Sequence, residues 1–333
     1  MSLDPKIRAG LTLPAVCAPM FLVSGPAMVR EACKAGVIGG LPRQNARAFE
    51  DFEAWLAEIR QALDAHRAAH PDARIAPMAV NLAQRLPADE LARHLDACRR
   101  YGVEIIISAT GDPTELIKRV HDWGGVVWHD VISLRFAEKA IAAGADGLTC
   151  VGAGGGGHSG TVSPLALVPK VRAMFDGTII MAGAVASGAA IRAAEVLGAD
   201  LAYLGTRFIA TQEAPVSEEY KRLLVSQTSA DLLYTDRIAG VAANWMRESM
   251  RQLGLDPDNL PEPVRKMSYE HLPAGVKPWK NLWSAGQGVD LIEDIPTVAE
   301  LVRRLRREYV AACETPDMAK VARLADQALE TQV

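Results

Sequence analysis

The sequence of 333 residues has few aromatic residues and no excess of positive charge. Phe, Trp and Tyr make up 5% of the chain, and 36 Lys and Arg residues stand against 40 Asp and Glu residues, for a formal net charge of -4. Proteins that bind nucleic acids usually carry clustered positive charge, and those that bind single strands also use aromatic side chains. The composition therefore argues against nucleic acid as a partner.

Paired cysteines and long apolar runs are also missing. The five cysteines, Cys17, Cys33, Cys98, Cys150 and Cys313, form no CxxC pair, which favours reduced thiols over disulfides or a zinc site. The chain lacks the run of about 18 apolar residues that spans a membrane. Its first residues also lack the apolar stretch of a signal peptide. We therefore expect a cytoplasmic protein without a membrane partner.

Eight short apolar runs alternate with longer amphipathic stretches in the first two thirds of the chain. The runs cover residues 15–20, 37–41, 75–81, 104–110, 126–131, 147–152, 178–183 and 201–206. Continuous apolar strands, each followed by a helix, are typical of a parallel sheet that is buried on both faces. Eight such units, without a GxGxxG turn after the first strand, favour an α/β fold of the closed (β/α)8 type, a TIM barrel, over an open sheet.

The alternation stops after Phe208. Residues 211–280 combine helical patterns with a proline-rich run, and we predict a mainly helical insertion, or lid, over the strand ends after strand eight. A helical pattern over 297–314 predicts the last barrel helix. The predicted organisation is a barrel from residues 1–210 and 281–315, an insertion at 211–280, and a C-terminal helix or tail at 316–333.

The sixth predicted strand ends in VGAGGGGHSG, with Gly154 to Gly157 directly before His158. Ligands of such barrels bind at the carboxyl ends of the strands. Glycines there let the backbone approach a ligand and adopt positive φ, although a merely flexible loop would have the same composition. Because ordering four glycines costs conformational entropy, we interpret the run as a binding loop, with His158 at the mouth of the pocket.

Glycines also follow strands seven and eight. Gly183 and Gly188 flank the turn after strand seven, and Gly205 and Thr206 lie at the tip of strand eight. In barrels of this kind, free N–H groups and the positive end of a helix dipole hold a phosphate at these turns. Each pair alone is a weak signal, because βα turns are rich in glycine. The two pairs together predict a phosphate-bearing cofactor or substrate.

Other predicted strand ends carry further candidates. They are Ala18, Pro19 and Met20 after strand one, Asn81 after strand three, and His129 and Asp130 after strand five. Asn81 can hydrogen-bond a planar heterocycle, or it can cap a helix or form an Asx turn. His129 lacks a third ligand at a suitable spacing, so we predict no metal site. It either supports His158 or is a buried structural histidine. In the GQG turn (286–288), Gln287 is a weaker candidate for reaching the ligand.

The segments GGHSG (156–160), MAGAV (181–185), LGTRF (204–208) and AGQG (285–288) together resemble the FMN-dependent nitronate monooxygenases, from residue 18 to about residue 287. Family members often carry Glu-Ala where this chain has Gly154 and Gly155. The resemblance implies that the barrel binds FMN, with its phosphate on Gly183, Gly205 and Thr206. The full set of predicted FMN-binding residues is Ala18, Pro19, Met20, Asn81, Gly156, Gly157, Gly183, Ala184, Gly205 and Thr206.

The resemblance also implies a reaction. Alkyl nitronates would be oxidised with dioxygen to a carbonyl compound and nitrite, and His158 would hydrogen-bond the nitro group or act as a base. An NAD(P)H-dependent FMN reductase of quinones or enoyl thioesters shares these motifs, and a non-flavin barrel that binds a sugar phosphate is a further alternative. The small-molecule substrate and dioxygen are the expected partners, and a homodimer remains open.

Overall fold

The structure, a computed structural model, describes residues 2–83, 86–266 and 268–314. Its centre is a closed parallel barrel with the strand order β1-β2-β3-β4-β5-β6-β8-β9. The strands are β1 (Ala15–Cys17), β2 (Ile38–Pro42), β3 (Met78–Ala83), β4 (Ile105–Ala109), β5 (Val126–Val131), β6 (Gly147–Val151), β8 (Thr178–Ala182) and β9 (Leu201–Leu204). Each coincides with one of the predicted apolar runs, so the prediction of a TIM barrel is confirmed.

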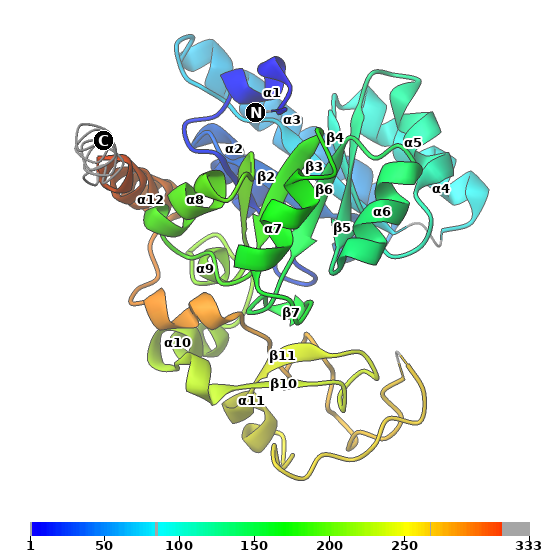
Figure 1. The fold of residues 1–333 in the computed structure, drawn as a ribbon, viewed down its shortest axis with the longest axis vertical. Coiled ribbons are helices and arrows are strands. Elements are labelled where there is room, and N and C mark those ends of the chain that lie inside the picture. Colours follow the sequence, from blue (N-terminus) through cyan, green and yellow to red (C-terminus); the bar gives the residue numbers. More distant parts are fainter. Residues whose placement is uncertain (1, 84–85, 267, 315–333) are drawn as a thin grey trace, which may run out of the picture.

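Helices cover the outside of the barrel (Figure 1). They are α2 (Pro26–Lys34), α3 (Phe49–Ala69), α4 (Ala88–Arg100), α5 (Thr114–His121), α6 (Leu134–Ala142), α7 (Pro164–Arg172), α8 (Gly188–Val196) and α12 (Val298–Cys313). The last of these, α12, is the helix predicted over 297–314. It begins with a capping box, in which Thr297 Oγ1 accepts from Glu300 N at 3.2 Å and Glu300 Oε2 accepts from Thr297 N at 2.9 Å.

The barrel interior is filled from its amino-terminal end. Alternate strand residues pack there, among them Val16, Ile38, Ala79, Ile105, Ile107, Trp128, Ile180 and Leu201. The short helix α1 (Pro5–Ala9) belongs to the same apolar cluster through Ile7, and it lies at the end opposite the insertion (Figure 1). A Cβ on Gly147 would lie 2.5 Å from Cδ1 of Trp128, so the glycine makes room for the indole. The carboxyl ends of the strands are therefore the end at which a ligand can bind.

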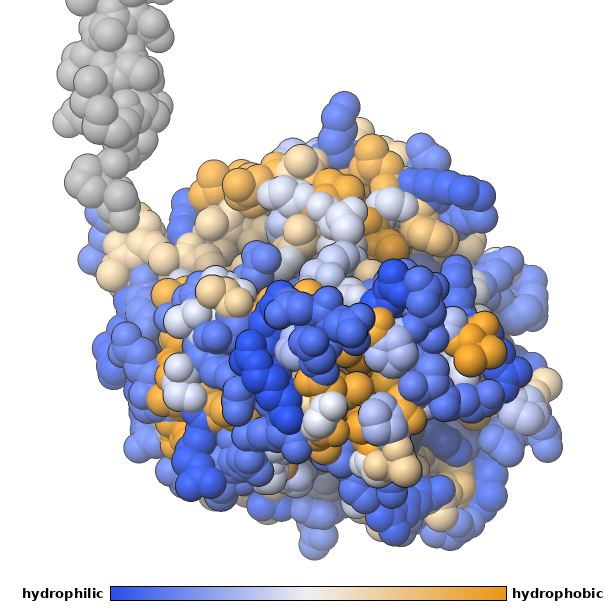
Figure 2. Space-filling view, turned by 90° about the horizontal axis from the view of Figure 1, so that it is seen from below, coloured by the Kyte–Doolittle hydropathy of each residue, from blue (hydrophilic) through white to orange (hydrophobic). Residues whose placement is uncertain are grey.

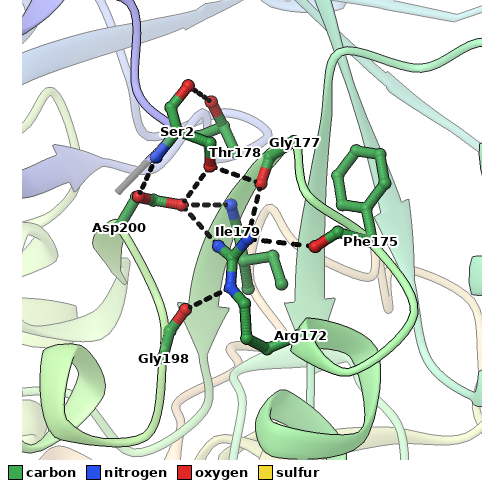
Figure 3. Close-up of polar contacts among 8 residues, drawn as sticks. All are labelled: Ser2, Arg172, Phe175, Gly177, Thr178, Ile179, Gly198 and Asp200. Carbon is green, nitrogen blue, oxygen red and sulfur yellow. Dashed lines mark hydrogen bonds and ion pairs between the residues drawn. The ribbon is translucent and has the colours of Figure 1, made fainter.

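A polar network fastens the amino-terminal segment under β8 and β9 (Figure 3). Asp200, 3% exposed, accepts hydrogen bonds from Ser2 N at 2.9 Å, Ile179 N at 2.9 Å and Arg172 Nη2 at 2.6 Å. Arg172 also donates to the backbone oxygens of Phe175, Gly177 and Gly198 at 2.8–3.0 Å. The buried carboxylate of Asp200 is therefore paired with the guanidinium of Arg172 and hydrogen-bonded by backbone N–H groups, as a buried charge requires.

The insertion contains a small sheet that the sequence analysis did not predict. It follows α9 (Thr206–Ile209) and consists of α10 (Glu218–Ser226), β10 (Leu232–Thr235), β11 (Ala243–Met246) and α11 (Arg247–Gln252), with the 3-10 turn Ser229–Asp231. β11 pairs with β10 and also with β7 (Gly157–His158), which follows the glycine run. The insertion at 211–280 was expected to be mainly helical, but residues 243–246 form β11. The short sequence Ala-Asn-Trp-Met before a helix does not distinguish a strand from a first turn, and here the pairing with β10 and β7 decides.

Seen from the side of the insertion, the surface is mostly hydrophilic and its apolar atoms gather in small patches (Figure 2). No helix in the described part of the chain is long and apolar enough to cross a membrane. The predicted tail at 316–333 lies outside the described residues.

Candidate active site

The glycine loop (residues 152–157) after β6 is held in place from the barrel side. Ala153 N donates to Val162 O at 2.7 Å, and Gly154 O accepts from both Ala184 N at 3.3 Å and Gln287 N at 2.9 Å. The loop is therefore tied to the turn after β8 and to the GQG turn, which opens the 3-10 helix Gln287–Leu291. This bonding argues against a merely flexible loop. The side chain of Gln287 itself is exposed.

Three buried side chains hold the same loop from the other side, and we call Asn244, Ser284 and Tyr220 the loop clamp. Asn244 Nδ2 donates to Gly155 O at 2.7 Å, and Ser284 Oγ accepts from Gly157 N at 2.7 Å. Ser284 Oγ in turn donates to Asn244 O at 2.5 Å, and Tyr220 OH donates to Ser284 O at 2.5 Å. No motif or spacing in the sequence marks any of the three.

Three of the sequence motifs meet at Thr206. Its Oγ1 accepts from Gly286 N at 2.8 Å. A Cβ on Gly156 would lie 3.0 Å from Gly286 N and 3.1 Å from Thr206 Oγ1. The glycine loop, the LGTRF turn and the AGQG turn are thus packed together, as their common assignment to one site requires.

The two predicted phosphate turns differ in how open they are. A Cβ on Gly183, which has φ +120°, would lie 2.6 Å from Ala153 O, so this glycine serves close packing against the loop. At Gly205, a Cβ would meet only Met20 Sδ at 3.5 Å and Ala18 Cβ at 3.9 Å. The ends of β1 and β9 therefore lie together, with the backbone of Gly205 open to a ligand.

The start of α8, by contrast, is covered by α12. Gly188 N donates to Glu308 Oε2 at 2.7 Å, and a Cβ on Gly188 would lie 2.2 Å from Leu305 O. A carboxylate of the protein thus already occupies the N-terminus of α8. Next to Gly205, Thr206 opens the short helix α9, in which Phe208 N and Ile209 N donate to Gly205 O at 2.8 Å and 3.3 Å. Ala184 lies between these turns, with φ +55°.

His158 lies in β7, where its backbone pairs with Ala243 of β11. Its ring meets the edge of Trp279 at a centroid distance of 5.4 Å, and Trp279 in turn lies 4.4 Å from Trp245. His158 is exposed, yet desolvation by the surrounding protein lowers its pKa below 6.5. At neutral pH the ring is therefore mainly uncharged and can accept a proton.

Asn81 and His129 face opposite sides of the barrel wall. Asn81, two residues after the interior Ala79, donates to Ile107 O and accepts from Gln44 Nε2, both at 3.3 Å, so it lies at the barrel mouth and caps no helix. His129 is 6% exposed and lies 2.8 Å from Ser108 Oγ on the outer face. Burial lowers the pKa of His129. Its surroundings fit a buried structural histidine, and it contacts Ser108 rather than His158.

No group of three or more His, Cys, Asp or Glu side chains that could hold a metal ion occurs among the described residues. The polar groups around the strand ends are backbone N–H groups, hydroxyls, an amide, one imidazole and the carboxyl group of Asp130. The backbone N–H groups and hydroxyls among them suit an anionic organic ligand.

Comparison with known proteins identifies the family. The sequence matches the nitronate monooxygenase family over residues 10–308. A nitronate monooxygenase of Paraburkholderia phytofirmans is 29% identical over 92% of this chain and 94% of its own length. A hydroxy-methyl-oxo-octahydroindene-carboxyl-CoA dehydrogenase of Rhodococcus jostii is 27% identical, over 70% of this chain and 62% of its own.

Solved structures share the fold. Nitroalkane oxidase of Streptomyces ansochromogenes superimposes with a TM-score of 0.71 at 24% identity, over 93% of this chain and 99% of its own. FabK of Thermotoga maritima gives a TM-score of 0.71 at 23% identity, over 94% of this chain and 98% of its own. The chain therefore belongs to the nitronate monooxygenase family and is an enzyme of the flavin-dependent oxidoreductase class.

Proposed function

We propose that the protein binds FMN at the carboxyl ends of the barrel strands and oxidises alkyl nitronates with dioxygen. The products are a carbonyl compound and nitrite. The observation that supports this most is the meeting of the glycine loop, the Gly205–Thr206 turn and the Gly286 turn beside an uncharged imidazole.

The residues at this place fit a phosphorylated flavin. A Cβ on Gly205 would meet no atom nearer than 3.5 Å, and the N–H groups of Thr206 and Arg207 begin α9 there, where a phosphate could bind. Thr206 Oγ1 accepts from Gly286 and keeps its own proton to donate to a phosphate oxygen. Gly183 and Ala184 line the neighbouring turn. Ala18, Pro19, Met20 and Asn81 lie at the strand ends on the other side of the mouth, where a planar ring would lie.

When bound, FMN would supply the electron transfer between the nitronate and dioxygen. The protein's contribution is to bind, orient and hold protons. His158, uncharged at neutral pH, donates a hydrogen bond to a nitronate oxygen from one ring nitrogen. Its other nitrogen can remove the α-proton of a neutral nitroalkane, which forms the nitronate at the site. Trp279 packs edge-on against the ring and limits the positions that it can adopt.

A thioester reductase is the second candidate, because one relative is named as a dehydrogenase of a carboxyl-CoA compound, that is, as a redox enzyme acting on a CoA thioester. In that case NAD(P)H would be the electron donor, and an enoyl thioester or a quinone would be the acceptor. The same FMN site would serve both reactions, so the sequence motifs do not distinguish them.

Anaerobic mixing of the FMN-loaded protein with propyl-2-nitronate, and separately with NADH, distinguishes the two. Bleaching of the flavin absorbance by the nitronate, with recovery and nitrite release on admitting air, is the expected result. Bleaching by NADH alone would favour the reductase. A protein that stays colourless after incubation with FMN would refute both flavin functions. Ser108→Ala, on the outer face, is the control for His158→Ala, which should slow bleaching but keep FMN bound.

A further inference from the structure

Trp279 lies on the insertion side of the site, with its indole against the end of the glycine loop. The indole and the His158 ring meet edge-on, with a centroid distance of 5.4 Å and an interplanar angle of 67°. A Cβ built on Gly157 would lie 3.5 Å from Cη2 and from Cζ3 of Trp279. The indole therefore lies next to both residues, and it borders the imidazole that the proposed function places beside the substrate.

The backbone of Trp279 has a conformation that a bulky residue rarely adopts. Its φ is +69°, in the left-handed region that favours glycine. Trp279 N donates to Leu282 O at 2.9 Å. Asn281 closes the turn, because its Oδ1 accepts from Lys277 N at 2.7 Å and its Nδ2 donates to Gly275 O at 2.9 Å. Strained backbone of this kind is concentrated at binding and active sites. The turn thus fixes the indole at the site, which points to a role for this side chain in binding.

The surroundings of the indole are apolar. Trp245, which is 0% exposed, lies behind it at a centroid distance of 4.4 Å. Trp279 packs against the apolar cluster of the insertion, to which Trp245, Leu272 and Leu282 belong. Because Trp279 is only partly buried, it brings this cluster to the surface next to His158. A surface of carbon atoms therefore adjoins the imidazole.

No charged group in the described chain acts on the imidazole from this side. Desolvation is the cause of the lowered pKa of His158, without a contribution from a charged neighbour. Lys277 and Lys280 flank Trp279 in the turn, but both are exposed. A substrate that reaches His158 along the indole therefore meets carbon atoms rather than a counter-ion.

We propose that Trp279 is a specificity-determining residue, an apolar wall that binds the alkyl chain of the substrate while His158 contacts its nitro group. The proposal rests on the proposed function, because it takes a nitronate as the substrate. It narrows the substrate class to nitronates with an apolar chain of several carbons, in preference to the shortest ones. Chain atoms that lie against the indole are removed from water, and each methylene group strengthens binding in proportion to the apolar area that it buries.

Straight-chain 1-nitronates from ethyl to hexyl test the wall. A fully buried methylene group raises the affinity about fourfold, and a chain on a partly exposed indole buries about half of its surface, so we expect about a twofold rise in kcat/KM for each added methylene. The FMN-loaded wild-type protein should then use hexyl nitronate about sixteenfold better than ethyl nitronate. In Trp279→Ala this ratio should fall below about fourfold. Trp279→Phe keeps a smaller apolar ring and should give an intermediate ratio.

Trp55→Ala is the matched control, because Trp55 is a half-buried tryptophan on α3, outside the barrel. It should keep the wild-type ratio. A displaced imidazole would lower kcat/KM by the same factor for every nitronate, so the ratio separates binding of the chain from positioning of His158. FMN content and thermal melts show which variants are folded, and the Trp279→Phe ratio decides where Trp279→Ala does not fold.

The dissociation constants of propanoate and heptanoate, measured by isothermal titration calorimetry, give a second readout that needs no turnover. A carboxylate resembles a nitronate in charge and planarity. Heptanoate should bind about sixteenfold more tightly than propanoate to the wild-type protein, and Trp279→Ala should lose most of this preference.

Equal kcat/KM for ethyl and hexyl nitronate in the wild-type protein, or an unchanged ratio in Trp279→Ala, would overturn the wall, while nitronate oxidation and the proposed function stand. If no nitronate is oxidised, the proposed function fails and the two carboxylates decide on the wall. A preference for heptanoate that Trp279→Ala loses then supports it, and equal binding of both carboxylates overturns it as well.

Discussion

The loop clamp is the part of the site whose removal has the most specific expected effect. Ser284 Oγ accepts from Gly157 N at 2.7 Å and donates to Asn244 O at 2.5 Å. Ser284→Ala leaves both backbone groups without a partner in a buried place, at about 1–3 kcal/mol for each. Local relaxation recovers part of this, so we expect a cost of about 2–4 kcal/mol.

Ser284→Ala should therefore destabilise the ordered conformation of the glycine loop rather than the barrel. If the ordered loop is needed for FMN, a factor of ten in affinity corresponds to about 1.4 kcal/mol. Ser284→Ala should then weaken FMN binding by about ten- to a hundredfold. Asn244→Ala, which frees Gly155 O, should have a smaller effect. The double variant should be non-additive, because both side chains act on one loop.

Ser249→Ala is the matched control. Ser249 is another buried serine whose Oγ donates to Met246 O at 2.7 Å and accepts from Trp283 N at 3.1 Å, but it does not contact the glycine loop. FMN affinity by fluorescence quenching and hydrogen exchange of residues 152–158 are measured for both variants. Equal losses of FMN affinity in Ser249→Ala and Ser284→Ala, or unchanged exchange in Ser284→Ala, would refute the role of the clamp.

Three further predictions concern His158 and the packing of the barrel. The kcat/KM for a neutral nitroalkane, from which His158 must remove a proton, should rise with pH to a plateau, with an inflection below 6.5 from the lowered pKa of His158; an inflection that His158→Ala retains contradicts this. Asp200→Ala, which removes the partner of Arg172, should lower the free energy of unfolding in urea by about 3–5 kcal/mol, and a loss under 1 kcal/mol would be inconsistent with the network. Gly183→Ala, with its Cβ 2.6 Å from Ala153 O, should lower the stability by about 1–3 kcal/mol and weaken FMN binding; wild-type values for both would show that the turn can shift.

The barrel was predictable because its signal is local. Each strand is marked by an apolar run in its own sequence. Because ligands of such barrels bind at the carboxyl ends of the strands, residues such as Asn81, Gly156 and Gly205 could then be assigned to one end of the barrel. His129 shows the limit of this reasoning. A histidine at a strand end faces either the mouth or the helix layer, and one residue of register decides which. The structure turns Asp130 to the interior and His129 to Ser108.

The clamp and the small sheet were not predictable, because their partners are distant in the chain. Asn244 is 89 residues from Gly155, and Ser284 is 127 residues from Gly157. The pairing of β7 with β11 likewise joins a two-residue strand to the insertion. The hydrogen bond from Gly188 N at the start of α8 to Glu308 likewise joins residues that are 120 positions apart. In all these cases nothing in the local sequence marks the residues, and their role follows only from contacts that the fold creates.

These long-range contacts also bear on whether the insertion can open as a lid. Its strand β11 pairs with the residue His158, Asn244 bonds to Gly155, and Tyr234 OH donates to Ser159 O at 2.8 Å. Ordering the glycine loop costs backbone entropy, and these bonds offset that cost. Movement of β11 away from the barrel would break them together and release the loop. The insertion therefore supports the glycine loop from the outside, and an opening motion that leaves the loop in place must occur beyond β11.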